Sequence, residues 1–166
     1  MLLNNLLYDC SEAGVPLDRV DPGPLSRPVR WDLPLIERFM LVLGPVSSAF
    51  DFLTFAALLY VFRADEALFQ TGWFVESLAT QVLVIFVIRT RGAPWRSRPH
   101  PALATLSLAV VAIGVALPLT PLGALFGFVP PPAAFYLFLV AAVAAYLGLV
   151  EATKRLFYRR LAPRAA

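Results

Sequence analysis

The chain has 166 residues, of which 59% are hydrophobic and only 15% are charged. Its mean hydropathy of +0.72 excludes a soluble globular domain, which needs a polar shell, and places the chain in a membrane. One cysteine and one histidine exclude an internal disulfide and a zinc site built from Cys and His. The net charge of +3 does not predict nucleic-acid binding, because most basic residues gather at the edges of apolar segments.

Four apolar segments are long enough to cross a bilayer, which requires about 20 residues of helix. They cover residues 39–62, 72–88, 102–119 and 133–150. Residues 1–10 form a shorter apolar segment that looks like the end of a longer helix. The sequence therefore predicts an all-α membrane protein with four transmembrane helices in two hairpins, preceded by a truncated helix.

The polar segments complete the predicted organisation. Residues 11–37 contain five prolines and mixed charges, which predicts an irregular loop before a bundle at residues 38–160. Residues 151–160 are expected to continue the last helix as a basic extension into the headgroup region, and residues 161–166 form a tail.

The basic residues predict the orientation, because Lys and Arg are retained on the cytoplasmic side during membrane insertion. Of the 14 Lys and Arg residues, only Arg63 lies outside three segments: the one before the first span, the gap between the second and third spans, and the tail. The 11–37 loop, the gap at residues 90–101 and the C-terminus are therefore expected to be cytoplasmic, with lipid around the spans.

Polar side chains at membrane depth are costly unless they are paired or hydrated, so they are candidates for function. Asn5 and Asp9 lie four residues apart in the first predicted helix, with Asn4 beside them. An amide and a carboxylate on one helical face suit a hard cation such as Mg²⁺. The alternative is that these residues lie at a helix end and in headgroup water.

The first span carries Ser47, Asp51 and Thr54 at the spacing of one helical face. Asp51 lies near the middle of the membrane and requires a partner. That partner is either a hydrogen-bonding group on a neighbouring helix or an ion.

The second span carries two pairs four residues apart, Glu76 with Thr80 and Ser77 with Gln81. Glu76 is near the predicted outer end of this span, so an alternative is that its carboxylate reaches the membrane interface. The sequence shows no nucleophile with a base, no phosphate-binding glycine loop and no oxidoreductase fingerprint.

Several motifs in a fixed order give the chain a recognisable pattern. They are Leu-Leu-Asn-Asn-Leu-Leu-Tyr-Asp at 2–9, Gly-Pro at 44–45, Ser-Ser-Ala-Phe-Asp-Phe-Leu-Thr-Phe at 47–55, Phe-Gln-Thr-Gly-Trp-Phe-Val-Glu-Ser-Leu-Ala-Thr-Gln at 69–81, and Pro-Leu-Gly at 121–123. With them the chain resembles the C-terminal membrane region of P-type cation ATPases, most closely the bacterial magnesium-transporting type.

The resemblance implies that residues 1–10 end the sixth membrane helix and that the four spans are helices seven to ten, in a bacterial inner membrane. It gives Asn5 and Asp9, and less directly Asn4, a role as ligands of transported Mg²⁺. The remaining polar intramembrane residues would support the bundle: Ser47, Asp51, Thr54, Glu76, Thr80 and Gln81.

The resemblance also defines what the chain lacks. It contains no Asp-Lys-Thr-Gly phosphorylation motif, nucleotide-binding domain or actuator domain, so it is not expected to hydrolyse ATP alone. ATP would act only through these missing domains, which a separate chain would carry in a split pump. A split pump, a truncated product and a fragment all fit the sequence. The sequence also fits a non-transporting scaffold or regulatory subunit derived from such a pump, or a module of a pump for another cation.

Overall fold

The computed structural model describes residues 2–18, 33–90, 92, 94 and 97–160. It is 84% helical, and the described residues contain no strand, which confirms the predicted all-α class. Much of the predicted 11–37 loop and the whole 161–166 tail lie outside the described residues. Within the loop, residues Val15–Leu17 form one turn of 3₁₀ helix.

The described residues form seven α-helices and three short turns of 3₁₀ or π helix, joined by short connections. The helices are α1 (Leu2–Glu12), α2 (Leu33–Ala56), α3 (Glu66–Leu83), α4 (Ile85–Ile88), α5 (Pro101–Ala116), α6 (Pro121–Leu125) and α7 (Ala133–Arg160). A π-helical turn, Ala57–Val61, closes α2, and a 3₁₀ turn, Leu117–Leu119, closes α5. Four of these stretches are long and apolar enough to span a membrane, as the sequence predicts.

The first two long helices begin earlier than their apolar runs. The first begins at Leu33 rather than residue 39, and the second at Glu66 rather than residue 72. Backbone hydrogen bonding continues a helix through charged residues, so hydropathy alone does not mark where the helix begins. At α3 the start is set by Asp65, whose side chain accepts a hydrogen bond from the Leu68 amide over 2.8 Å.

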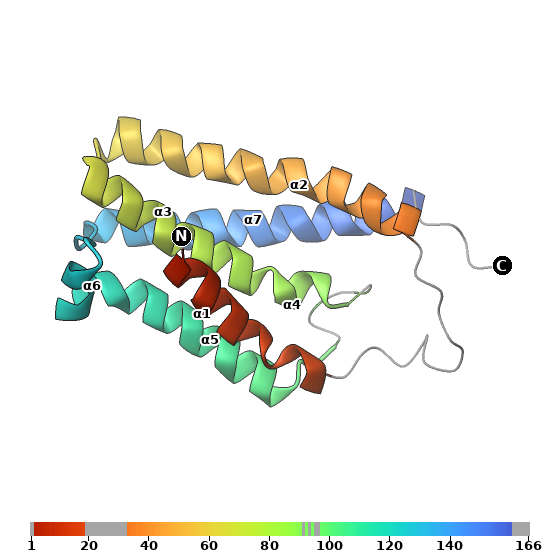
Figure 1. Ribbon diagram of the computed structural model, residues 1–166. Helices are drawn as coiled ribbons and strands as arrows, with labels where there is room; N and C mark the ends of the chain where they lie inside the picture. Colours follow the sequence, from red (N-terminus) through yellow and green to blue (C-terminus); the bar gives the residue numbers. More distant parts are fainter. Residues whose placement is uncertain (1, 19–32, 91, 93, 95–96, 161–166) are drawn as a thin grey trace.

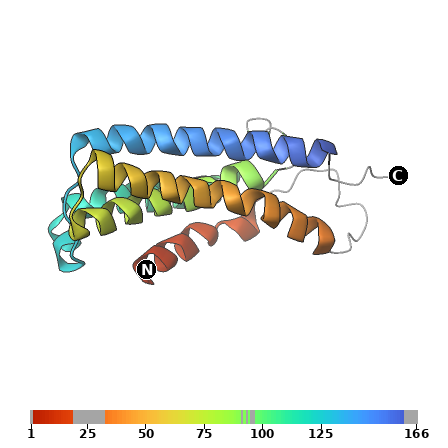
Figure 2. The same cartoon turned by 90° about the horizontal axis from the view of Figure 1, so that it is seen from above.

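Helix α3 lies at the centre of the bundle, in contact with α1, α2, α5 and α7 (Figures 1 and 2). Of its most apolar stretch 61% is buried, against 11% for the equivalent stretch of α2. Leu58, Val75, Leu78, Val82 and Phe135 form the centre of the main apolar core. The second span is therefore the scaffold on which the other helices pack.

The turn after α1 and the start of α5 approach each other so closely that only glycine fits at position 14. At Gly14, a methyl group in place of the hydrogen would lie 2.7 Å from the backbone Cα of Leu103. Glycine is thus required where the end of α1 rests on the start of α5. This contact holds α1 beside α5.

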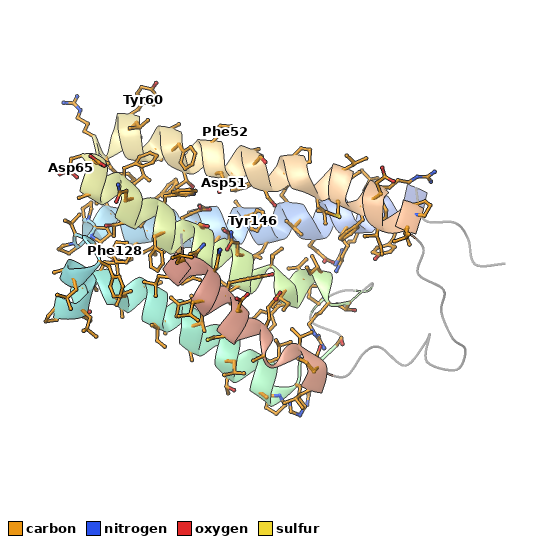
Figure 3. All side chains as sticks on the ribbon, viewed as in Figure 1. Asp51, Phe52, Tyr60, Asp65, Phe128 and Tyr146 are labelled. Atoms are coloured by element: carbon orange, nitrogen blue, oxygen red, sulfur yellow. The ribbon has the colours of Figure 1, made fainter. Side chains whose placement is uncertain are left out.

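The connections gather at the two ends of the bundle. The short 62–65 link and the 117–132 segment lie at one end, whereas the start of α2, the end of α4, the start of α5 and the end of α7 lie at the other (Figure 1). Large apolar side chains such as Phe52 of α2 and Tyr60 of the π-helical turn after it point outward (Figure 3) and are 69% and 81% exposed. An apolar outer surface of this kind contacts lipid in a multi-pass membrane protein.

Candidate functional site

A cavity of about 220 Å³ lies inside the bundle where α1, α2, α3 and α7 meet. Five of the six polar residues predicted to support the bundle line it, and Thr54 does not. The lining consists of Tyr8, Ser47, Phe50, Asp51, Glu76, Ser77, Thr80, Gln81, Val84 and Tyr146. Residues that are far apart in the sequence therefore line one polar cavity among the membrane-length helices.

Glu76 is the most enclosed acidic group of this cavity. Only 1% of the residue is exposed, and its Oε2 atom has no hydrogen-bond partner. Thr80 donates a hydrogen bond to the backbone carbonyl of Glu76 over 3.0 Å, not to its carboxylate. The Glu76 side chain is enclosed by the bundle instead of reaching outward from it, and α3 begins well before this residue, at Glu66.

The α2 wall of the cavity is formed by Ser47 and Asp51. The Ser47 hydroxyl lies 2.9 Å from the Tyr146 hydroxyl of α7, and the Asp51 carboxylate accepts a hydrogen bond from Trp73 of α3. Figure 3 shows Asp51 and Tyr146 on facing sides of the helices that enclose the cavity. Thr54 shares the helical face but is completely buried outside the cavity.

The three predicted ion ligands of α1 fall on different faces. Asn4 is buried, and its Nδ2 atom donates to Ser77 Oγ over 3.4 Å and to Gln81 Oε1 over 3.3 Å. Asn5 and Asp9 are exposed, one turn apart. In the described chain, no three His, Cys, Asp or Glu side chains come together to hold a metal. Helix α1 thus offers an amide and a carboxylate on a face that this chain leaves open.

An ionic network at the other end of the bundle was not predicted from the sequence. Arg89, at the end of α4, forms two bonds to the Asp18 carboxylate, Nε to Oδ2 at 2.7 Å and Nη2 to Oδ1 at 3.1 Å. The backbone N–H of His100 also donates to Asp18 Oδ1, over 2.7 Å. The network joins the segment after α1 to both ends of the 89–100 segment.

Lys154 is the exception within the basic extension predicted at the end of the last helix. The extension at residues 151–160 is helical, but Lys154 is fully buried rather than placed among headgroups. Its Nζ atom donates to three backbone carbonyls and lies 2.6 Å from the carboxylate of Glu151. The spacing of Glu151 and Lys154 is a signal for an ion pair, but not for its burial.

The comparisons with known proteins agree with this architecture. Residues 1–156 match the family described as cation transporting ATPase, C-terminus. The chain is 42% identical over 166 residues to a magnesium-transporting ATPase, P-type 1, of Salmonella typhimurium LT2, and 38% identical over 165 residues to the protein of the same name in Escherichia coli K12. Each alignment covers 96% of this chain but only 18% of the relative. The four membrane-length helices and these matches establish that the chain belongs to the family of cation-transporting P-type ATPase C-terminal regions.

Proposed function

We propose that this chain is the C-terminal membrane module of a magnesium-translocating P-type ATPase. The observation that carries the proposal is the position of Asn5 and Asp9 in a chain so similar to magnesium-transporting relatives. Polar groups inside a membrane are normally paired, yet these two stay exposed in the described chain while neighbouring Asn4 packs against α3. They supply part of a Mg²⁺ site that helices outside this chain complete.

The other polar residues support the bundle around that site. Thr80 and Gln81 bond within α3 and to α1, and Ser47 bonds to α7. ATP acts on the module through phosphorylation, nucleotide-binding and actuator domains, which a separate chain carries if the pump is split. The 11–37 loop and the C-terminus face the cytoplasm of a bacterium, as the basic residues predict.

The test replaces the C-terminal region of the Salmonella relative with this chain and measures Mg²⁺-stimulated ATPase activity in membranes. We expect the chimera to be active and Asp9→Asn to reduce its activity at least tenfold, because one ligand charge is lost. Asn5→Ala removes a neutral ligand that water replaces, so its effect is smaller. The control is Glu66→Gln, which removes an exposed carboxylate of α3.

An active chimera in which Asp9→Asn has no effect would contradict the ligand role. A folded but inactive chimera would favour a scaffold or regulatory subunit that does not transport. Activity stimulated by Ca²⁺ instead of Mg²⁺ would assign the module to a pump for another cation.

A further inference from the structure

The two chain links at the α6 end of the bundle differ in charge (Figure 1). The link between α2 and α3 carries Arg63 and Asp65, followed by Glu66 at the start of α3, and all three residues are exposed. The link between α5 and α7 contains α6 and carries no charge, because residues 101–150 include no Asp, Glu, Lys, Arg or His. Links that face water are normally polar, so the two links are suited to different surroundings.

Helix α6 and the turn before it direct large apolar side chains away from the bundle. Leu119, Leu122 and Leu125 are 60%, 60% and 81% exposed. We call these three residues the α6 patch. A cluster of exposed leucines without any charge beside it marks a surface that contacts another molecule or a membrane.

The fold holds the α6 patch in a fixed direction. On the opposite side of α6, a methyl group in place of the Gly123 hydrogen would lie 2.3 Å from the carbonyl oxygen of Leu117, so α6 packs directly on the preceding turn. After α6, the ring of Phe128 stacks on Phe74 of α3, with the ring centroids 4.6 Å apart. Helix α6 is therefore attached through its inner side, and the patch faces outward.

The length of the preceding span gives the depth of the α6 patch in the membrane. The stretch Pro101–Leu119 has 19 residues. At about 1.5 Å per residue it covers about 28 Å, close to the roughly 30 Å thickness of the hydrocarbon core. Helix α6 follows directly, at Pro121, so it lies where the hydrocarbon meets the headgroups. The molecule nearest to the patch at this depth is lipid.

We propose that α6 is an interfacial anchor, whose patch of Leu119, Leu122 and Leu125 inserts between the headgroups and the acyl chains of the leaflet at this end of the bundle. Interfacial helices bury their apolar face about 5–10 Å into this boundary. In the orientation that the basic residues predict, this is the outer leaflet. The anchor fixes the depth of the hairpin formed by α5 and α7, and it does not depend on the proposed transport function.

The experiment attaches a nitroxide label to single cysteines of the full chain, in phosphatidylcholine nanodiscs that hold one chain each. Cys10→Ser first removes the native cysteine. Electron paramagnetic resonance then compares collisions with oxygen, which concentrates in lipid, and with a nickel chelate, which stays in water. We expect a label at Leu125→Cys to collide with the nickel chelate about fivefold less often than a label at Glu66→Cys. Glu66 is the matched control because it is exposed on the charged link at the same end of the bundle, and Phe52→Cys gives the lipid reference.

Leu122→Cys tests the same patch independently, and circular dichroism identifies any variant that fails to fold. Equal collision rates with the nickel chelate at positions 125 and 66 of folded chains would overturn the proposal. So would protection at position 125 that appears only in nanodiscs with two chains, because the patch would then bind a second copy of this chain. Both results would leave the proposed transport function intact, so the two ideas can fail separately.

Discussion

The ammonium nitrogen of Lys154 donates a hydrogen bond to the carbonyl oxygen of Val87 over 2.8 Å, which joins the last helix to the end of α4. The same nitrogen bonds to the carbonyls of Thr90 and Gly92. The last carbonyls of a helix have no partner within it, so a cation at this position satisfies them and interacts favourably with the helix dipole. Lys154 therefore stabilises the end of α4 and the residues that follow it.

Lys154→Met should destabilise the bundle, because methionine fills a similar volume but leaves the carbonyls without their donor. The expected loss in free energy of unfolding is about 3 kcal/mol, typical of removing one partner of a buried ion pair. Denaturation with sodium dodecyl sulfate in mixed micelles, followed by circular dichroism, measures it. Arg155→Met is the control: Arg155 also pairs with Glu151, but its side chain is 48% exposed, so its loss should be below about 1 kcal/mol. Equal losses of unfolding free energy in Lys154→Met and Arg155→Met would contradict the stabilising role of Lys154.

Arg89→Lys should loosen the network around Asp18. Lysine keeps the charge but cannot form the two parallel bonds of the guanidinium group. The backbone N–H of His100, which donates to the same carboxylate, should exchange its hydrogen several-fold faster in the variant. Hydrogen exchange read by mass spectrometry measures this change. Arg38→Lys, at an exposed position of α2, should exchange like the original chain, and unaltered exchange at His100 in Arg89→Lys would refute the network's role.

Asn4→Ala and Asn5→Ala should separate packing from ion binding. Asn4 forms two hydrogen bonds to α3, and hydrogen bonds between membrane helices contribute about 0.6 kcal/mol each, so its loss should lower the unfolding free energy by about 1 kcal/mol. Asn5 is exposed, so its substitution should leave stability unchanged and lower the Mg²⁺ response of the chimera. The unfolding free energy and the ATPase activity, measured on both variants, test this prediction. A stability loss in Asn5→Ala and none in Asn4→Ala would show that α1 turns a different face toward α3.

Reporter fusions test the orientation. Alkaline phosphatase, which is active only after export, should be active when fused after Phe62 or after Leu119, because the segments at those positions hold one basic residue between them. Fluorescent protein at the C-terminus should fold in the cytoplasm. An inactive phosphatase after Leu119 would reverse the assignment of the second hairpin.

The sequence alone determined the helical class and the number of membrane-length helices. Four apolar stretches predicted four membrane-length helices, because the membrane requires long apolar helices whose backbone groups are satisfied internally. Their starts were less predictable. Asp65 caps α3 before the apolar run begins, since capping follows local hydrogen bonding and not hydropathy.

Only the tertiary structure decided which polar side chains meet. Asn4 and Asn5 are adjacent and chemically identical, yet one packs against α3 and the other is exposed, because the rotation of α1 depends on its contacts with α3 and α5. Asp51 and Glu76 belong to different spans and share a cavity only because α2 and α3 pack side by side. Lys154 is buried because the end of α4 offers it three carbonyls, and no local pattern in the sequence encodes that distant partner.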